Sequence, residues 1–252
     1  MLKYDAMSFG NHEFDDGLQK TIDGSEYIGL APYLKEVDAP FVCSNIKTNK
    51  SEIDGLYQSY RILLNDDPKK RVGVVGYVTP ETSQISHPGA RIKFLDEIES
   101  LKIAVAKLNA LGVKKIVAVG HSGYDKDKEI CRKVPGVDVV VGGHTNSFLY
   151  SGEPPVNQTV DGDYPTVVKN LDGSNCLVVQ SYAYGKYLGF LEVEFDDETG
   201  EVKNFRGNPM LMNNSYEDDP TVVEMLAPYQ KIVDEYQRTV IGKTAVTLVG
   251  NR

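Results

Sequence analysis

Short apolar runs alternate with longer amphipathic segments along the first half of the chain. The runs with strand character are rich in β-branched and aromatic residues and lie at 4–9, 41–45, 60–64, 71–76, 115–120 and 137–142. The segments with the apolar spacing of a helix lie at 18–37, 94–111 and 126–134. This alternation predicts a layered α/β fold with a mainly parallel sheet and right-handed crossovers.

The pattern changes after residue 148. A loop rich in proline and glycine at 152–165 precedes predicted antiparallel strands at 166–169, 176–181, 187–195 and 202–206. We expect these strands to form a second sheet that packs on the first. A helix from Pro220 to about Tyr236 and a strand over 244–249 follow, and no boundary divides the chain, so one domain over 1–252 is predicted.

Three of the four histidines follow predicted strands. Asn11 and His12 lie in a tight glycine-containing turn after the first strand. His121 and His144 follow two later strands, and Asn146 comes two residues after His144. The carboxyl ends of parallel strands meet at one edge of a sheet, where amide oxygens and imidazoles can bind metal. The sequence therefore predicts half of a dinuclear metal centre, although a single strand-end histidine can also cap a helix or fill a turn.

Several segments resemble one family. GNHEFD, GHSGYDKD, GVDVVVGGHTNSFLYSG and YAYGKYLGFLEVEFD are similar to the N-terminal metallophosphatase domain of ecto-5'-nucleotidases and salivary apyrases. The resemblance runs from Tyr4 to about Thr247 and keeps the family's motif order and spacing. It implies a calcineurin-like metallophosphoesterase sandwich, in which a mixed, largely parallel sheet packs on a second sheet with helices outside.

The resemblance also implies roles for residues of the predicted site. Two divalent metal ions are expected, with zinc as the metal. The residues implied as metal ligands are Asn11, His121 and His144 for one ion and Asn146 for the other. His12, oriented by Asp15, would donate a hydrogen bond or proton at the phosphate and the leaving oxygen. The alternative role of Asp15 is to cap the helix that follows.

Other polar residues receive simpler interpretations. Asn45 ends a strand and is implied by the resemblance as a substrate contact. Asp125 and Asp127 are expected to form a charge pair at a helix N-terminus. His87 is expected in a solvated loop. Packing within the sheet is the expected role of three tyrosines, Tyr182, Tyr184 and Tyr187.

The chain also departs from the family pattern. No Asp-x-His sequence occurs, and the only Gly-Asp, Gly162-Asp163, lies in the proline-rich loop. In the family, both motifs precede GNHE and supply the missing carboxylates. We therefore expect a chain that is incomplete at both ends, lacking its first strands and a C-terminal nucleotide-binding domain, and inactive alone.

The resemblance implies that the full-length protein hydrolyses nucleoside 5'-monophosphates, converting AMP to adenosine and phosphate. One alternative is an apyrase that hydrolyses ATP and ADP. An alternative of another class is a non-catalytic remnant or binding protein that keeps the fold. The full-length protein is expected outside the cell or on its surface, as a homodimer.

Composition and charge argue against two kinds of interaction, with nucleic acid and across a membrane. A net charge of -9 argues against nucleic acid, and the absence of an 18-residue apolar run argues against a membrane-spanning segment. A small nucleotide would have to be attracted locally by metal charge. The three cysteines, Cys43, Cys131 and Cys176, have unrelated spacings and are expected to be free or buried thiols.

Overall fold

The computed structural model describes residues 2–49, 51–64 and 66–247. Packing divides the chain into two compact units, Met1–Leu211 and Met212–Arg252, and each is described by itself. A division by packing is not a test of independent folding, so the expected single domain over 1–252 stays a prediction.

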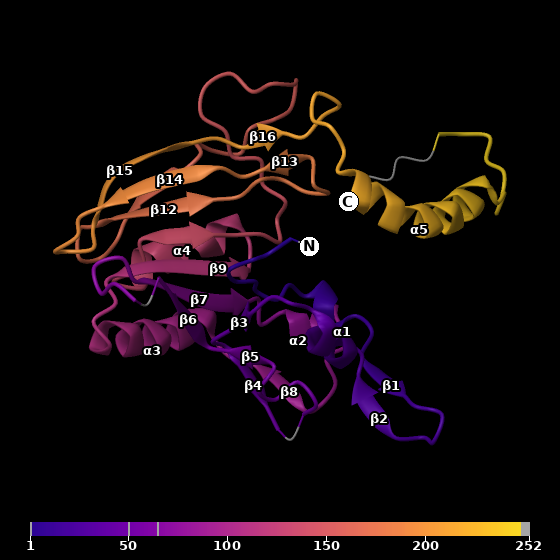
Figure 1. Cartoon of the computed structure of the whole chain (residues 1–252), viewed down its shortest axis with the longest axis horizontal. Coiled ribbons are helices and arrows are strands. Elements are labelled where there is room, and N and C mark those ends of the chain that lie inside the picture. Colours follow the sequence, from indigo (N-terminus) through magenta and orange to yellow (C-terminus); the bar gives the residue numbers. More distant parts are fainter. Residues whose placement is uncertain (1, 50, 65, 248–252) are drawn as a thin grey trace. The chain divides into compact units, whose positions relative to one another are not determined.

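A six-stranded sheet forms the centre of the first unit (Figure 1). Its strands, in spatial order, are β11 (Thr166–Lys169), β12 (Asn175–Val179), β10 (Val139–Val141), β9 (Lys115–His121), β7 (Val72–Val78) and β6 (Tyr60–Leu63). The four inner strands run parallel, whereas β6 and β11 are antiparallel edges. The predicted mixed, largely parallel α/β sheet is confirmed, and β6 and β7 form an antiparallel hairpin at one edge.

Two helices cover one face of this sheet. They are α3 (Glu97–Ala110) and α4 (Tyr124–Lys133), and their apolar residues share a buried core with the sheet. The Asp96 carboxylate accepts a hydrogen bond from the Glu99 amide and begins α3. Gly112, with φ of 77°, follows the end of α3. Residues 92–94, part of which was expected in this helix, form strand β8 (Ile92–Phe94) instead.

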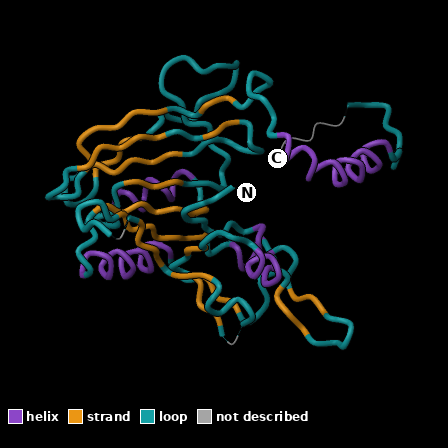
Figure 2. The backbone as a smooth tube through the Cα atoms, in the orientation of Figure 1, coloured by secondary structure: helices purple, strands orange, loops and turns teal. Residues whose placement is uncertain are grey.

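The opposite face of the sheet faces β14 (Leu191–Phe195). Val140 of β10 lies in the helix-side core, whereas its neighbours Val139 and Val141 line a cavity of about 560 Å³ on the other side. Leu191 closes this cavity from β14. The strands therefore bury apolar residues on both faces, as parallel strands usually do. Figure 2 shows the resulting strand layers in orange.

The predicted second sheet is partly wrong. The strands at 166–169 and 176–181 become β11 and β12 of the central sheet, because β12 pairs in parallel with β10. Its run Cys176 to Val179 is buried throughout, which suits an inner strand better than a half-exposed one. The strand expected at 187–195 is two strands, β13 (Tyr187–Leu188) and β14. They pair antiparallel with β16 (Met210–Leu211) and β15 (Val202–Gly207) respectively.

The helix expected at 18–37 is wrong in its first half. Antiparallel strands β1 (Leu18–Lys20) and β2 (Glu26–Ile28) occupy it, and only α1 (Leu30–Glu36) is helical. The turn explains the difference, because Gly24 has φ of 85° and the Asp23 carboxylate accepts from the Ser25 amide at 3.0 Å. The strand expected at 4–9 is reduced to one bridge, Met7 to Phe41.

Smaller elements surround the N-terminal turn. They are η1 (His12–Phe14), β3 (Phe41–Val42) paired in parallel with β5 (Tyr57–Gln58), β4 (Ile46–Thr48) paired antiparallel with β8, and α2 (Thr82–Ile85). Phe9 stacks on Phe41 with ring centroids 4.8 Å apart and meets Phe14 edge-on at 5.7 Å. This aromatic cluster anchors both ends of the turn that carries Asn11 and His12.

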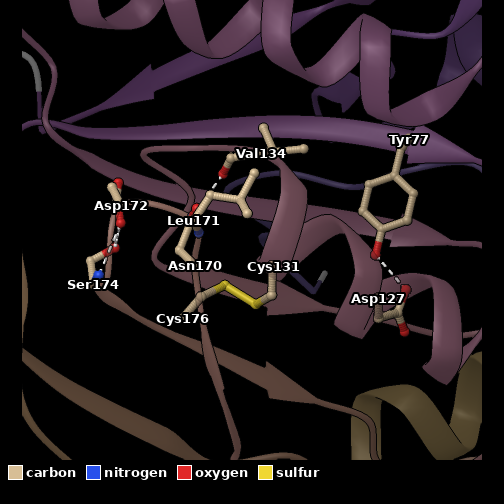
Figure 3. Close-up of a disulfide and its surroundings, with 9 residues drawn as sticks. All are labelled: Tyr77, Asp127, Cys131, Val134, Asn170, Leu171, Asp172, Ser174 and Cys176. Carbon is tan, nitrogen blue, oxygen red and sulfur yellow. Dashed lines mark hydrogen bonds between the residues drawn. A yellow bond between two sulfur atoms is a disulfide. The ribbon is translucent and has the colours of Figure 1, made fainter.

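A disulfide joins α4 to β12, between Cys131 and Cys176 (Figure 3). The expectation of free thiols is therefore wrong for these two cysteines, whereas Cys43 is free and buried. The spacing of the cysteines in the sequence did not indicate this pair. The two sulfur atoms meet because the fold places α4 against β12, although the cysteines are 45 residues apart. Asn170 Nδ2 donates to the Val134 carbonyl at 3.0 Å beside the bond.

The second unit contains α5 (Pro220–Arg238), as predicted. Asp219 caps it by accepting from the amides of Thr221 and Val222, and Pro220 occupies the first turn. Residues 244–247 form no strand, and 248–249 lie outside the described residues. Among the described residues, no helix combines the length and apolar composition needed to cross a bilayer.

Removal of the disulfide should destabilise the protein. A cross-link that closes a loop of 45 residues restricts the unfolded chain, so Cys131→Ser/Cys176→Ser should lower the unfolding free energy by roughly 2–4 kcal/mol. Urea unfolding measures this difference. Dithiothreitol should produce the same loss in the unsubstituted protein and no further loss in the variant. Equal stability of the two proteins without reductant would contradict the cross-link.

Asp138 should make stability depend on pH. Burial raises the pKa of this carboxyl to about 7, and its Oδ2 accepts from the Ile116 amide at 2.7 Å. The folded state holds the proton more tightly than the unfolded state, so this stabilisation is complete below about pH 4 and is lost as pH rises through 7. Between pH 5.5 and 7.5, the unfolding free energy should fall by about 2 kcal/mol more than in Asp138→Asn. The exposed control Asp218→Asn should retain the full pH dependence in urea unfolding.

Candidate metal centre

Three loops meet beyond the carboxyl edge of the central sheet. One carries Asn11, the second begins at His121 at the end of β9, and the third carries His144 after β10. His144 Nδ1 lies 3.2 Å from Asn11 Oδ1, and the rings of His121 and His144 have centroids 5.0 Å apart. The structure thus brings together the three residues predicted as ligands of one metal.

Glycines allow this close approach. A Cβ atom on Gly10 would lie 3.2 Å from the His121 ring, and one on Gly143 would lie 2.9 Å from His121 Nδ1. A Cβ atom on Gly120 would overlap the Tyr77 ring. The glycine beside each predicted ligand therefore lets the loops pack closely enough for the side chains to meet.

The loop after β10 has an unusual backbone. His144 and Asn146 have φ of 78° and 54°, in the left-handed region that residues other than glycine rarely adopt. Each such residue costs roughly 1–2 kcal/mol, so the surroundings must hold the loop in place. Asn146 is exposed, and within the described part of the chain no hydrogen bond joins it to Asn11 or the two histidines. Its assignment to the second metal stays a prediction.

Electrostatics favour a neutral His121. Burial lowers the pKa of its imidazole to about 4, with further contributions from His144 and His12. A neutral imidazole keeps the lone pair that a metal needs. The ring is therefore in its metal-binding form at neutral pH.

The donors fit one divalent ion. Ligand atoms about 2.1 Å from a tetrahedral ion stand roughly 3.4 Å apart, close to the 3.2 Å between His144 Nδ1 and Asn11 Oδ1. Two imidazoles and an amide oxygen are all neutral donors. Among the described residues, no three His, Cys, Asp or Glu side chains form a metal-binding group. The set therefore fits part of a metal site without its anionic donors.

His12 and Asp15 form the predicted pair at the same edge. His12 Nδ1 lies 2.6 Å from Asp15 Oδ2, and Ser86 Oγ donates to Asp15 Oδ1 at 2.6 Å. The bond from Ser86 is the largest cause of a lowered pKa at Asp15, followed by the bond to His12. An ionised carboxylate only accepts, so Nδ1 is the donor and Nε2 is left for another partner. The alternative role of Asp15 as a helix cap is wrong, because β1 follows it.

Asn45 lies below the surface. It has no exposed area, and its Nδ2 donates to the carbonyls of Val78 and Leu95 at 2.7 and 2.9 Å. Its Oδ1 accepts from the Val78 amide at 3.0 Å. The amide therefore joins the end of β7 to the segment before α3, and the expected substrate contact stays a prediction.

Three residues near the site, Ser86, Tyr77 and Gln180, were not predicted, and the role of Asp127 was misinterpreted. Asp125 and Asp127 lie in the first turn of α4 as expected, and Asp125 pairs with Lys128 on the surface. Asp127 is fully buried, so it does not form the expected charge pair with Asp125. Tyr77 and Gln180 donate to the Asp127 carboxylate, whose pKa burial raises to about 7. The only sequence signal for Gln180 is its place directly after an apolar run at the same sheet edge.

The three tyrosines that follow β12 differ in how far their side chains are exposed. Tyr187 is buried and stacks on Phe148 with centroids 4.5 Å apart, as expected for packing. Tyr184 is 83% exposed and Tyr182 is 37% exposed, so the packing interpretation is wrong for Tyr184 and incomplete for Tyr182. His87 is exposed in a loop, as expected.

Comparison with known proteins finds a family, relatives and a solved structure that agree with one another. The calcineurin-like phosphoesterase family matches residues 1–148. A 5'-nucleotidase of Bos taurus is 48% identical over 252 residues, and a snake venom 5'-nucleotidase of Naja atra is 45% identical over 252 residues. A crystal structure of a 5'-nucleotidase precursor from Thermus thermophilus superimposes with a TM-score of 0.88 at 38% identity. These matches confirm the resemblance and the metallophosphoesterase fold.

The matched region is nearly the whole of this chain but only part of each relative. They cover 99% of this chain but only 42% of the Bos taurus protein, 46% of the Naja atra protein and 47% of the Thermus thermophilus chain. This chain therefore spans less than half the length of these relatives.

A side chain at Gly143 should disturb the histidine pair. Gly143→Ala places a Cβ 2.9 Å from His121 Nδ1, so the His121 ring must move. We expect shifted ring signals for His121 and His144 in NMR spectra, while the exposed His87 keeps its signals. Gly242→Ala, which has nothing within 4 Å of its added Cβ, is the matched control. Unchanged His121 signals in Gly143→Ala would contradict the packing.

Proposed function

Because the chain belongs to the calcineurin-like phosphoesterase family, we propose that its site hydrolyses nucleoside 5'-monophosphates, with AMP as substrate, to the nucleoside and phosphate. Relatives that match 99% of the chain are called 5'-nucleotidases, which supports this substrate class. The observation that carries the proposal is the meeting of Asn11, His121 and His144 at one point.

The site's first task is to hold metal. Asn11, His121 and His144 would bind one divalent ion, and Asn146 would contribute to a second. Imidazole donors suit zinc, which is the metal we propose. Bound in pairs, such ions activate a water molecule and neutralise charge on the phosphoryl oxygens. The neutral form of His121 and the 3.2 Å spacing of two donor atoms support this assignment.

The second task is to move a proton. Asp15 holds His12 through Nδ1, so Nε2 can donate to the phosphate or to the departing nucleoside oxygen. The His12 side chain is 68% exposed, which leaves it accessible to a substrate at this edge. Ser86 fixes the far side of Asp15, so the pair is oriented before substrate arrives.

An extracellular site of action fits two observations. A buried disulfide persists in oxidising compartments and is rare in the cytosol. One of the relatives is a snake venom protein, which is secreted. We propose that this protein acts outside the cell or on its surface.

The 252 residues alone should be inactive, because the three donors that meet are neutral and no anionic partner joins them within the described part of the chain. A chimera tests the site in a complete setting: this chain replaces the 252 matched residues of the Bos taurus 5'-nucleotidase. The chimera should release phosphate from AMP in the presence of zinc and lose this activity with a chelator. The isolated chain should release none.

A variant of His12 tests proton donation separately from metal binding. In the chimera, His12→Asn should lower kcat by roughly 10²–10⁴-fold while bound zinc stays constant, because proton donation is lost. Glu224→Gln, at an exposed position of α5, is the control and should keep full activity. A folded, zinc-loaded chimera without AMP hydrolysis would refute the proposed function. AMP hydrolysis by the isolated chain would refute only its predicted inactivity.

A further inference from the structure

A buried network lies beside the loop that carries His144 and Asn146. It consists of Tyr77 of β7, Asp127 of α4 and Gln180 directly after β12, with exposed fractions of 0%, 0% and 3%. Tyr77 Oη donates to Asp127 Oδ1 at 2.6 Å, and Gln180 Nε2 donates to Asp127 Oδ2 at 2.7 Å. Figure 3 shows the tyrosine pointing at the carboxylate. Three elements distant in sequence therefore meet at one buried acid.

Gln180 connects this acid to the loop. Its Nε2 also donates to the Gly143 carbonyl at 3.0 Å. Its Oε1 accepts from the Ser147 amide at 3.0 Å and from Thr145 Oγ1 at 3.3 Å. Both donor and both acceptor positions of the amide are thus used. The partners in the loop lie on either side of His144 and Asn146.

The orientation of the Gln180 amide is determined by its partners. A reversed amide would place its oxygen against the Gly143 carbonyl and its nitrogen against the Ser147 amide. Both contacts would be repulsive, and Asp127 Oδ2 would lose its donor. Asp127 is in turn held by Tyr77. The network therefore has one favourable arrangement.

We propose that Gln180 is a positioning residue that fixes the loop from Gly143 to Ser147, and that Asp127 and Tyr77 fix Gln180. The inference rests on the proposed function, because that function makes this loop the carrier of metal ligands. His144 and Asn146 lie in the left-handed region, which strains the backbone of the loop. Gln180 makes three hydrogen bonds to the loop, one buried and two partly buried, and these oppose that strain.

The network differs from ordinary core filling. An apolar side chain of similar size at 180 would fill the same volume but remove the acceptor of the Ser147 amide, and it would leave the Gly143 carbonyl with only the Thr145 amide as donor. Gly142 also leaves room for the Asp127 carboxylate, because a Cβ atom at Gly142 would overlap Asp127 Oδ2. The space and the polar partners are therefore both arranged around the loop.

The test uses the 252-residue chain and two variants. Gln180→Glu keeps an acceptor for Ser147 but loses both donors and places a carboxylate against Asp127. Gln180→Glu/Asp127→Asn reverses the pair and restores a hydrogen bond between positions 127 and 180. The matched control is Gln230→Glu, because Gln230 Nε2 donates to Asp234 Oδ1 at 2.8 Å on the exposed surface of α5.

Two measurements are made on each protein. Amide hydrogen exchange of residues 143–147 reports the loop without metal. Titration with cobalt(II), followed through the ring signals of His121 and His144, reports the affinity of the site. Gln180→Glu should exchange at least about tenfold faster and bind cobalt(II) about 10–100-fold more weakly. The double variant should recover part of both losses, because the contact with position 127 returns while the Gly143 carbonyl still lacks its donor from position 180. Gln230→Glu should match the unsubstituted chain.

The outcomes separate the inference from the proposed function. Unchanged amide hydrogen exchange of residues 143–147 in Gln180→Glu would show that Gln180 does not hold the loop. Faster exchange with unchanged cobalt(II) affinity would overturn the positioning role and leave the metal site standing. No rescue by the double variant would overturn the role of Asp127. A failure of the unsubstituted chain to bind cobalt(II) would overturn the metal site itself, and the positioning role with it.

Discussion

The site depends on the register of the parallel strands. Val78 of β7 pairs with His121 of β9, and Val141 of β10 pairs with both Val119 of β9 and Val179 of β12. In this register the inner strands deliver their loops to one edge at the same height. A shift of one residue would exchange the helix face and the cavity face of a strand, so burial on both faces locks the register. The functional groups inherit their positions from this apolar packing.

Features with local physical causes could be predicted from the sequence. The sheet strands and α3 follow from apolar spacing, and Asp96 and Gly112 mark the ends of that helix. The convergence of His121 and His144 was also predictable, because parallel strands must end at a common edge. Asn11 joins them although the strand expected before it is reduced to one bridge. The pairing of His12 with Asp15 needs only a turn of three residues.

Features with distant causes could not be predicted. The sequence from 18 to 28 has helical apolar spacing, but the turn at Gly24 makes it a hairpin. The place of β12 is decided by its partner β10 rather than by its own residues. The bond between Cys131 and Cys176 and the contacts of Gln180 likewise depend on folded geometry. A single glutamine or cysteine gives no pattern from which such contacts can be read.

The disulfide has a further topological meaning. It closes residues 131–176 into a covalent ring, and this ring contains His144, Asn146 and the long loop at 152–165. Asn11 and His121 lie outside the ring. A protease that cuts once within the loop would therefore release no piece, because the two products remain joined through sulfur. The piece that carries His144 and Asn146 stays attached on its Cys131 side, and the piece that follows the cut stays attached through Cys176.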